Sequence, residues 1–114
     1  MRIEVRDAGG VRVISCTGQM TLDAGADAVT RSCDAAIDAG ARSIVVDLTA
    51  LSFLDSAGVG ALVASAKQAG NRGAVVRIAI PSAGVVPRIF EITQLNLAFE
   101  VFDDVEEAVR SFRA

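Results

Sequence analysis

The chain has 114 residues, of which 52% are hydrophobic and 22% are charged, with a formal net charge of −3. This size and mixture predict a single folded domain spanning residues 1–114 and exclude a disordered chain. The absence of histidine excludes a serine–histidine or cysteine–histidine nucleophile pair and a histidine-bound metal.

The N-terminal half predicts a hairpin, a helix and a buried strand. Residues 2–6 alternate polar and apolar, and residues 11–16 follow a glycine-rich turn, which predicts a β-hairpin. Between residues 22 and 39 the apolar positions recur every three or four residues, as on one face of a helix. These positions are Leu22, Ala26, Val29, Cys33 and Ile37. Residues 43–48 are apolar through their middle, which is typical of a strand covered on both faces in a parallel sheet.

The C-terminal half predicts an alternation of helix and strand. After a short loop, a helix begins within residues 53–60 and runs to about residue 69, with Val59, Leu62, Val63 and Ala66 on its buried side. Further strands are predicted at residues 75–80 and 99–102, and further helices at residues 86–93 and 105–112. The order β-β-α-β-α-β-α-β-α predicts an α/β fold in which about four helices pack on a small mixed sheet.

Several features of the sequence predict a cytoplasmic protein with no direct membrane insertion. The first residues lack the apolar core of a signal peptide, and no apolar run approaches the ~18 residues of a spanning helix. Cys16 and Cys33 lie in apolar-patterned segments without C-x-x-C spacing, so both are expected to be buried thiols in a reducing compartment. The basic residues stand singly, which argues against binding to nucleic acid.

One segment departs from this regular pattern, F-L-D-S-A-G-V-G at residues 53–60. It lies past a buried strand where a helix begins, which is the usual place for a binding site in α/β folds. Asp55 and Ser56 are both favourable helix N-caps, whereas Gly58 and Gly60 each cost about 1 kcal/mol of helix stability relative to alanine. The two glycines therefore indicate close packing of the helix or the close approach of a partner.

The residues of this segment leave two interpretations open. A phosphate-binding loop is excluded because both glycine-rich phosphate motifs are absent, and a serine nucleophile lacks a base. A capped helix with glycines for packing explains every residue. A phosphoacceptor at Ser56 is also consistent, because a helix N-terminus stabilises an anion, while a docked partner would meet about −1.5 to −2 units of new charge.

The segment resembles the D-S-[ST]-G-[LIV]-G signature of bacterial STAS-domain anti-sigma-factor antagonists. The resemblance covers the whole chain and includes the order of the elements and the initial hairpin. Further matching residues are Gly18 after the second strand, Asp47-Leu48 at the end of the apolar strand, and Arg88-Ile89-Phe90. The fold that the resemblance implies is a STAS-like mixed sheet packed with helices.

The resemblance implies a regulatory binding protein that is not an enzyme and uses no cofactor or metal. In that family an anti-sigma factor that is also a serine kinase phosphorylates the serine after the aspartate, which is Ser56 here. The unphosphorylated antagonist binds the anti-sigma factor and frees the sigma factor, and a phosphatase resets the switch. The residues expected to contact the partner are Asp55, Ser56, Ala57, Gly58, Val59, Gly60 and Thr21.

Two positions depart from the family pattern. Ala57 stands where a second hydroxyl residue is usual, and Thr21 stands where an acidic residue usually lies near the phosphoacceptor, with Asp23 two residues on. These departures support a second interpretation, a STAS adaptor outside sigma control that docks on a membrane transporter or joins a stress-signalling complex. A third, a nucleotide-binding protein or enzyme, is disfavoured by the missing phosphate loop and histidine.

Overall fold

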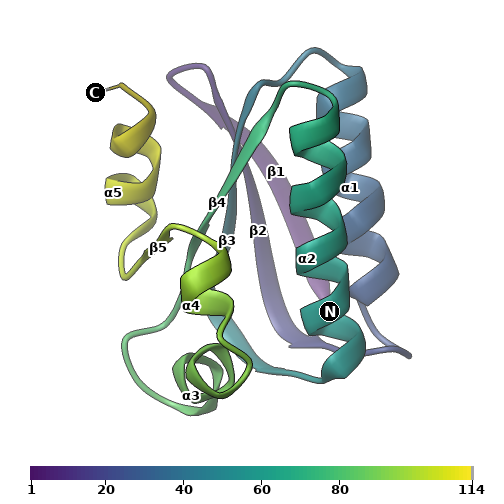
Figure 1. Cartoon of the computed structure of the whole chain (residues 1–114), viewed down its shortest axis with the longest axis vertical. Coiled ribbons are helices and arrows are strands. Elements are labelled where there is room, and N and C mark those ends of the chain that lie inside the picture. Colours follow the sequence, from purple (N-terminus) through teal and green to yellow (C-terminus); the bar gives the residue numbers. More distant parts are fainter. Residues whose placement is uncertain (114) are drawn as a thin grey trace.

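A computed structural model describes residues 1–113 as a five-stranded sheet with helices on both faces (Figure 1). The strands are β1 (Arg2–Ala8), β2 (Val11–Met20), β3 (Ser43–Leu54), β4 (Val75–Ala79) and β5 (Val101–Phe102). The helices are α1 (Ala26–Asp38), α2 (Ser56–Asn71), α3 (Val85–Ile92), α4 (Leu95–Ala98) and α5 (Val105–Arg110), followed by the 3₁₀ turn η1 (Ser111–Arg113). The predicted α/β fold is confirmed, and α4 is an additional short helix.

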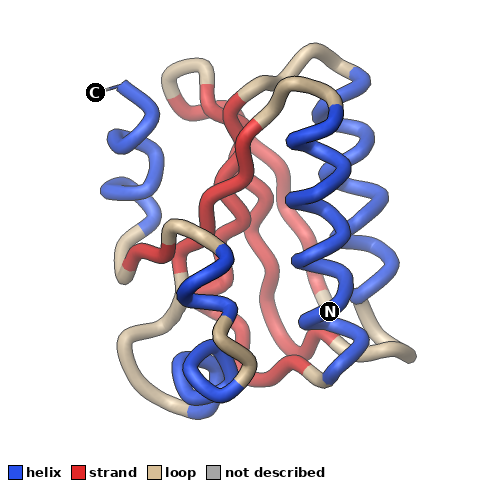
Figure 2. The backbone as a smooth tube through the Cα atoms, viewed as in Figure 1, coloured by secondary structure: helices blue, strands red, loops and turns tan. Residues whose placement is uncertain are grey.

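The strands lie side by side in chain order, from β1 to β5 (Figure 2). β1 and β2 form the predicted antiparallel hairpin, and every later pair is parallel, so the predicted mixed sheet is confirmed. Each parallel pair requires a crossover, which the helices supply. The carboxyl ends of β2, β3 and β4 therefore meet at one edge of the sheet.

The alternation of side chains along β3 divides the core between the two faces of the sheet. Ile44 and Val46 belong to the larger cluster, which includes buried residues of α1, α2, α3 and α4. Val45, between them, belongs to a smaller cluster with Ala108 and Val109 of α5. A strand buried on both faces explains the uninterrupted apolar run, as predicted.

Helix α1 begins later than the pattern predicts, and Leu22 is 75% exposed instead of buried. The cause is a closed turn before the helix, in which the Thr21 N–H donates to the Ala24 oxygen at 2.7 Å and the Ala26 N–H donates to the Thr21 oxygen at 3.1 Å. Gly25, with φ of 94°, is left-handed and cannot continue a helix backwards. The other predicted positions of this face are buried.

Strand β3 is longer than predicted. Residues 49–54 were expected to form a short loop and the first part of the segment at residues 53–60, but they extend the strand alongside the end of β2. Gly18 pairs with Leu51 after a first register shift, and Met20 pairs with Leu54 after a second. This extension carries the chain to the edge of the sheet immediately before α2 begins.

Cys16 and Cys33 are buried free thiols, as predicted. Burial raises the pKa of Cys16 to about 12 and that of Cys33 to about 11. Both thiols are therefore protonated at neutral pH and are poor nucleophiles. Within residues 1–113, none of the helices has the length and apolar character needed to cross a membrane.

Candidate functional site

The Asp55 carboxylate joins the start of α2 to the turn that follows β2. Its Oδ1 accepts a hydrogen bond from the Gly58 N–H at 2.9 Å, so Asp55 is the N-cap of α2. Its Oδ2 accepts a second bond from the Leu22 N–H at 3.1 Å, and its own N–H donates to the Met20 oxygen at 3.2 Å. Of the two predicted cap residues, Asp55 takes this role.

These hydrogen bonds also set the ionisation of the site. The bond from the Gly58 N–H, and then the bond from the Leu22 N–H, lower the pKa of the Asp55 carboxyl. Asp55 therefore carries a full negative charge at neutral pH, immediately beside Ser56.

Ser56 is the first residue of α2 and is exposed. Helix α2 has 16 residues, and Ser56 lies at its N-terminus. The free N–H groups and the positive end of the helix dipole are therefore close to Ser56. A negative group added to the Ser56 hydroxyl would therefore stand in a favourable field and in open solvent.

Gly58 and Gly60 have different surroundings. Gly58 is buried, and a Cβ there would overlap the backbone oxygen of Met20 and come within 3.0 Å of the Leu54 Cβ. Gly60 is exposed, and apart from its chain neighbours and the backbone of its own helix, a Cβ there would have no heavy atom within 4 Å. Close packing therefore explains Gly58, whereas nothing within the fold requires Gly60.

The structure brings Thr21 to the site and divides the other predicted residues by exposure. Thr21 is half-buried in the turn whose next residue, Leu22, is bonded to Asp55. Ala57 and Val59 are half-buried and pack against the larger core cluster. Ser56 and Gly60 are thus the most accessible members of the predicted segment.

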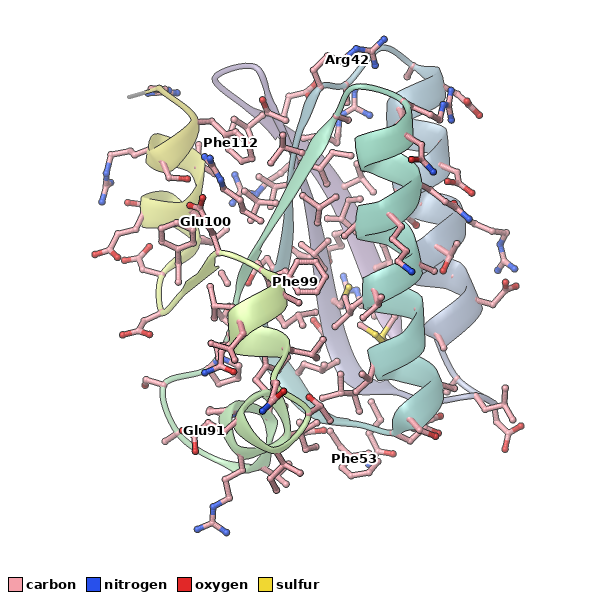
Figure 3. All side chains as sticks on the ribbon, in the orientation of Figure 1. Arg42, Phe53, Glu91, Phe99, Glu100 and Phe112 are labelled. Atoms are coloured by element: carbon pink, nitrogen blue, oxygen red, sulfur yellow. The ribbon has the colours of Figure 1, made fainter. Side chains whose placement is uncertain are left out.

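Two exposed apolar side chains near Ser56, one in the turn after β2 and one at the first position of the segment, were not among the predicted site residues. Leu22 is 75% exposed and Phe53 is 38% exposed. Figure 3 shows Phe53 at the edge of the sheet, between the start of α2 and α3. Leu22 fitted the helical pattern of α1, and Phe53 lay in a segment whose strand pairing the sequence does not reveal. No sequence signal marked either one as a surface residue.

Asp55→Asn tests the two hydrogen bonds that the Asp55 carboxylate accepts. The asparagine side chain has one oxygen, so it can accept the hydrogen bond from the Gly58 N–H or the one from the Leu22 N–H, but not both in their present positions. We expect a lower thermal midpoint at pH 7 and faster hydrogen exchange at the Leu22 amide. The pKa of Asp55 is lower in the folded protein than its ordinary value of 3.8. The ionised carboxylate therefore contributes fully to stability when the pH is above 3.8, and this contribution is lost as the pH falls through the lowered pKa. The difference between the midpoints of the two proteins should therefore close in acid, and a difference independent of pH would contradict this assignment.

The geometry defines a small α/β domain that presents a serine at an exposed helix start, where parallel strands end. The chain belongs to the STAS domain family, whose family model matches residues 2–108.

Several solved structures share this fold. A crystal structure of an anti-sigma factor antagonist from Mycobacterium paratuberculosis matches 99% of this chain and 94% of its own, with a TM-score of 0.86 and 24% identity. The anti-sigma factor antagonist SpoIIAA in its unphosphorylated form matches 99% of both chains, with a TM-score of 0.73 and 21% identity. The Bacillus cell fate determinant SpoIIAA in its phosphorylated form matches 96% of this chain and 99% of its own, with a TM-score of 0.69 and 20% identity.

Proposed function

We propose that the protein is an anti-sigma-factor antagonist, which binds an anti-sigma factor at the start of α2 and releases it when Ser56 is phosphorylated. The observation that carries this proposal is the exposed Ser56 at the first position of α2, directly after the N-cap Asp55. Similarity to proteins described as anti-sigma factor antagonists supports it, as does the phosphorylated form known for SpoIIAA.

Phosphorylation of Ser56 acts on binding rather than on folding. The N-terminus of α2 stabilises the negative charge of the phosphate, which remains in solvent, so the domain keeps its fold. A partner docked on α2 instead meets a dianion that it must desolvate, next to the ionised Asp55. A hundredfold loss of affinity requires about 2.8 kcal/mol, which is within the range of such charge effects.

The proposed contact surface combines the exposed part of the segment with its apolar neighbours. Gly60, open to solvent, allows the backbone of a partner to approach α2 closely. Leu22 and Phe53 supply apolar area on the same edge. Asp55 and Gly58 act by holding α2 against the end of β2.

Purification of the protein from its native cells tests the proposal. We expect site mapping by mass spectrometry to find one phosphoryl group on Ser56, and an anti-sigma factor with serine kinase activity to copurify with the unphosphorylated form. Adding ATP should dissociate the complex, and Ser56→Ala should keep it intact. A serine that stays unmodified across growth and stress conditions would contradict the proposal.

A second candidate function follows from Thr21 and Ala57, which stand where the family pattern has an acidic and a hydroxyl residue. These substitutions remove one carboxylate and one hydroxyl that a kinase could use for recognition near Ser56. We propose as the alternative a STAS adaptor that docks on a membrane transporter or in a stress-signalling complex. Copurification of a permease or transport ATPase, with Ser56 unmodified, would establish it.

A further inference from the structure

A pocket lies away from the Ser56 edge, between β1 and the C-terminal helical segment. It encloses about 320 Å³ and is lined by Arg6, Ala8, Glu106, Val109, Arg110 and Arg113. Arg6 pairs with Val13 and Ala8 pairs with Val11, and both valines belong to the core cluster beneath α5. The pocket is therefore on the face of the sheet that α5 covers, whereas α2 packs on the other face. In Figure 1 the turn between β1 and β2 and the C-terminal end of the chain lie at the end of the molecule opposite the start of α2.

The lining of this pocket is basic in an acidic protein. Three arginines face one glutamate, although the chain as a whole has a net charge of −3. The nearest approach of Arg110 to Glu106 is 3.9 Å, and no ion pair within residues 1–113 involves Arg6 or Arg113. The described residues therefore place three guanidinium groups around this pocket, of which only Arg110 has a carboxylate partner, Glu106.

The turn between β1 and β2 makes room for one of these groups. Gly9 has a φ of +58°, and a Cβ there would overlap the guanidinium of Arg113. Arg6 projects on the same face of β1 as Ala8, because the side chains of a strand alternate. The hairpin and the C-terminal segment thus direct positive charge into one space from two sides.

We propose that this pocket binds the phosphate group of a small phosphorylated molecule, a monoester or a pyrophosphate. A guanidinium group can donate two parallel hydrogen bonds to two oxygens of a phosphate. A bound anion would also reduce the repulsion among the three arginines. Ala8 and Val109 offer an apolar surface to the carbon part of the ligand. The volume is at the lower end of the range for small-molecule sites, so it favours a small soluble ligand over a macromolecule. This site is independent of the function proposed for Ser56.

Calorimetric titration of the full chain with pyrophosphate is the first test. We expect saturable binding with one site, weakened by added NaCl. Arg6→Gln combined with Arg113→Gln should weaken it at least tenfold. Lys67→Gln combined with Arg88→Gln makes the same change of net charge at exposed positions of α2 and α3, and should alter the affinity less than twofold. Equal losses in the two double variants would overturn the proposal, because they would indicate a nonspecific charge effect.

Glu106→Gln provides a test with the opposite sign. It removes the one carboxylate that lines the pocket within residues 1–113, so it should tighten pyrophosphate binding several-fold, which damage to the fold cannot do. The amides of Ala8 and Val109 should shift on binding in NMR spectra, and Ser56→Ala should change neither result. Absence of saturable binding would overturn the proposal, as would binding to phosphatidic acid vesicles without binding to free pyrophosphate.

Discussion

Gly58→Ala is expected to lower the free energy of unfolding by about 2 kcal/mol, within the range known for overpacked sites. The added methyl would overlap the backbone oxygen of Met20, which cannot rotate away as a side chain could. Relief requires α2 to move off the end of β2, and this movement strains the bonds of Asp55 to Gly58 and Leu22. Urea denaturation followed by circular dichroism measures the effect.

Gly60→Ala is the matched control, since it makes the same substitution two residues later in the same helix. Its methyl would enter open space, so the helix gains alanine's higher propensity, up to about 1 kcal/mol. The two variants should therefore shift stability in opposite directions. If both destabilised the protein, the close packing would not be specific to Gly58. If the function proposed above is correct, Gly60→Ala also weakens partner binding in a protein that is more stable.

This pair of glycines shows how far the sequence could predict the site. The local pattern placed the helix start within residues 53–60, narrowed the N-cap to Asp55 or Ser56 and identified the two costly glycines, because capping and propensity depend on neighbouring residues. It could not separate Gly58 from Gly60, because the difference lies in Met20, which is close only after β2 and β3 have paired. The choice between packing and partner contact therefore requires the tertiary structure.

The differences in the fold have the same origin. Periodicity predicted the hairpin, the doubly buried strand and the mixed sheet, all of which are confirmed. It misplaced Leu22, because the turn at residues 21–25 uses backbone hydrogen bonds that leave no apolar pattern. In α2 the fully buried positions are Gly58, Leu62, Ser65 and Ala69, and only Leu62 was predicted among them. Ser65 can be buried because its hydroxyl donates to the Ala61 oxygen at 2.8 Å, a contact that hydrophobicity does not reveal.

If the start of α2 binds an anti-sigma factor as proposed, Ser56→Asp is expected to weaken that binding at least tenfold while changing the stability of the free protein by less than about 0.5 kcal/mol. Stability is preserved because the new carboxylate lies at the positive end of α2, which offsets its repulsion by Asp55. Binding is lost because the same carboxylate must be desolvated in the contact. Full phosphorylation, with about twice the charge, should reach the hundredfold range.

Asn71→Asp separates the two consequences of the added charge. It places the same charge at the exposed last residue of α2, where the helix dipole is unfavourable and costs about 0.3–1 kcal/mol. A 16-residue helix is about 24 Å long, so this charge is screened from a partner docked at the other end. We therefore expect Asn71→Asp to lower stability and preserve affinity, and Ser56→Asp to preserve stability and lower affinity. Thermal unfolding measures stability and calorimetry measures affinity. If affinity followed net charge or stability in both variants, the start of α2 would not be the binding surface.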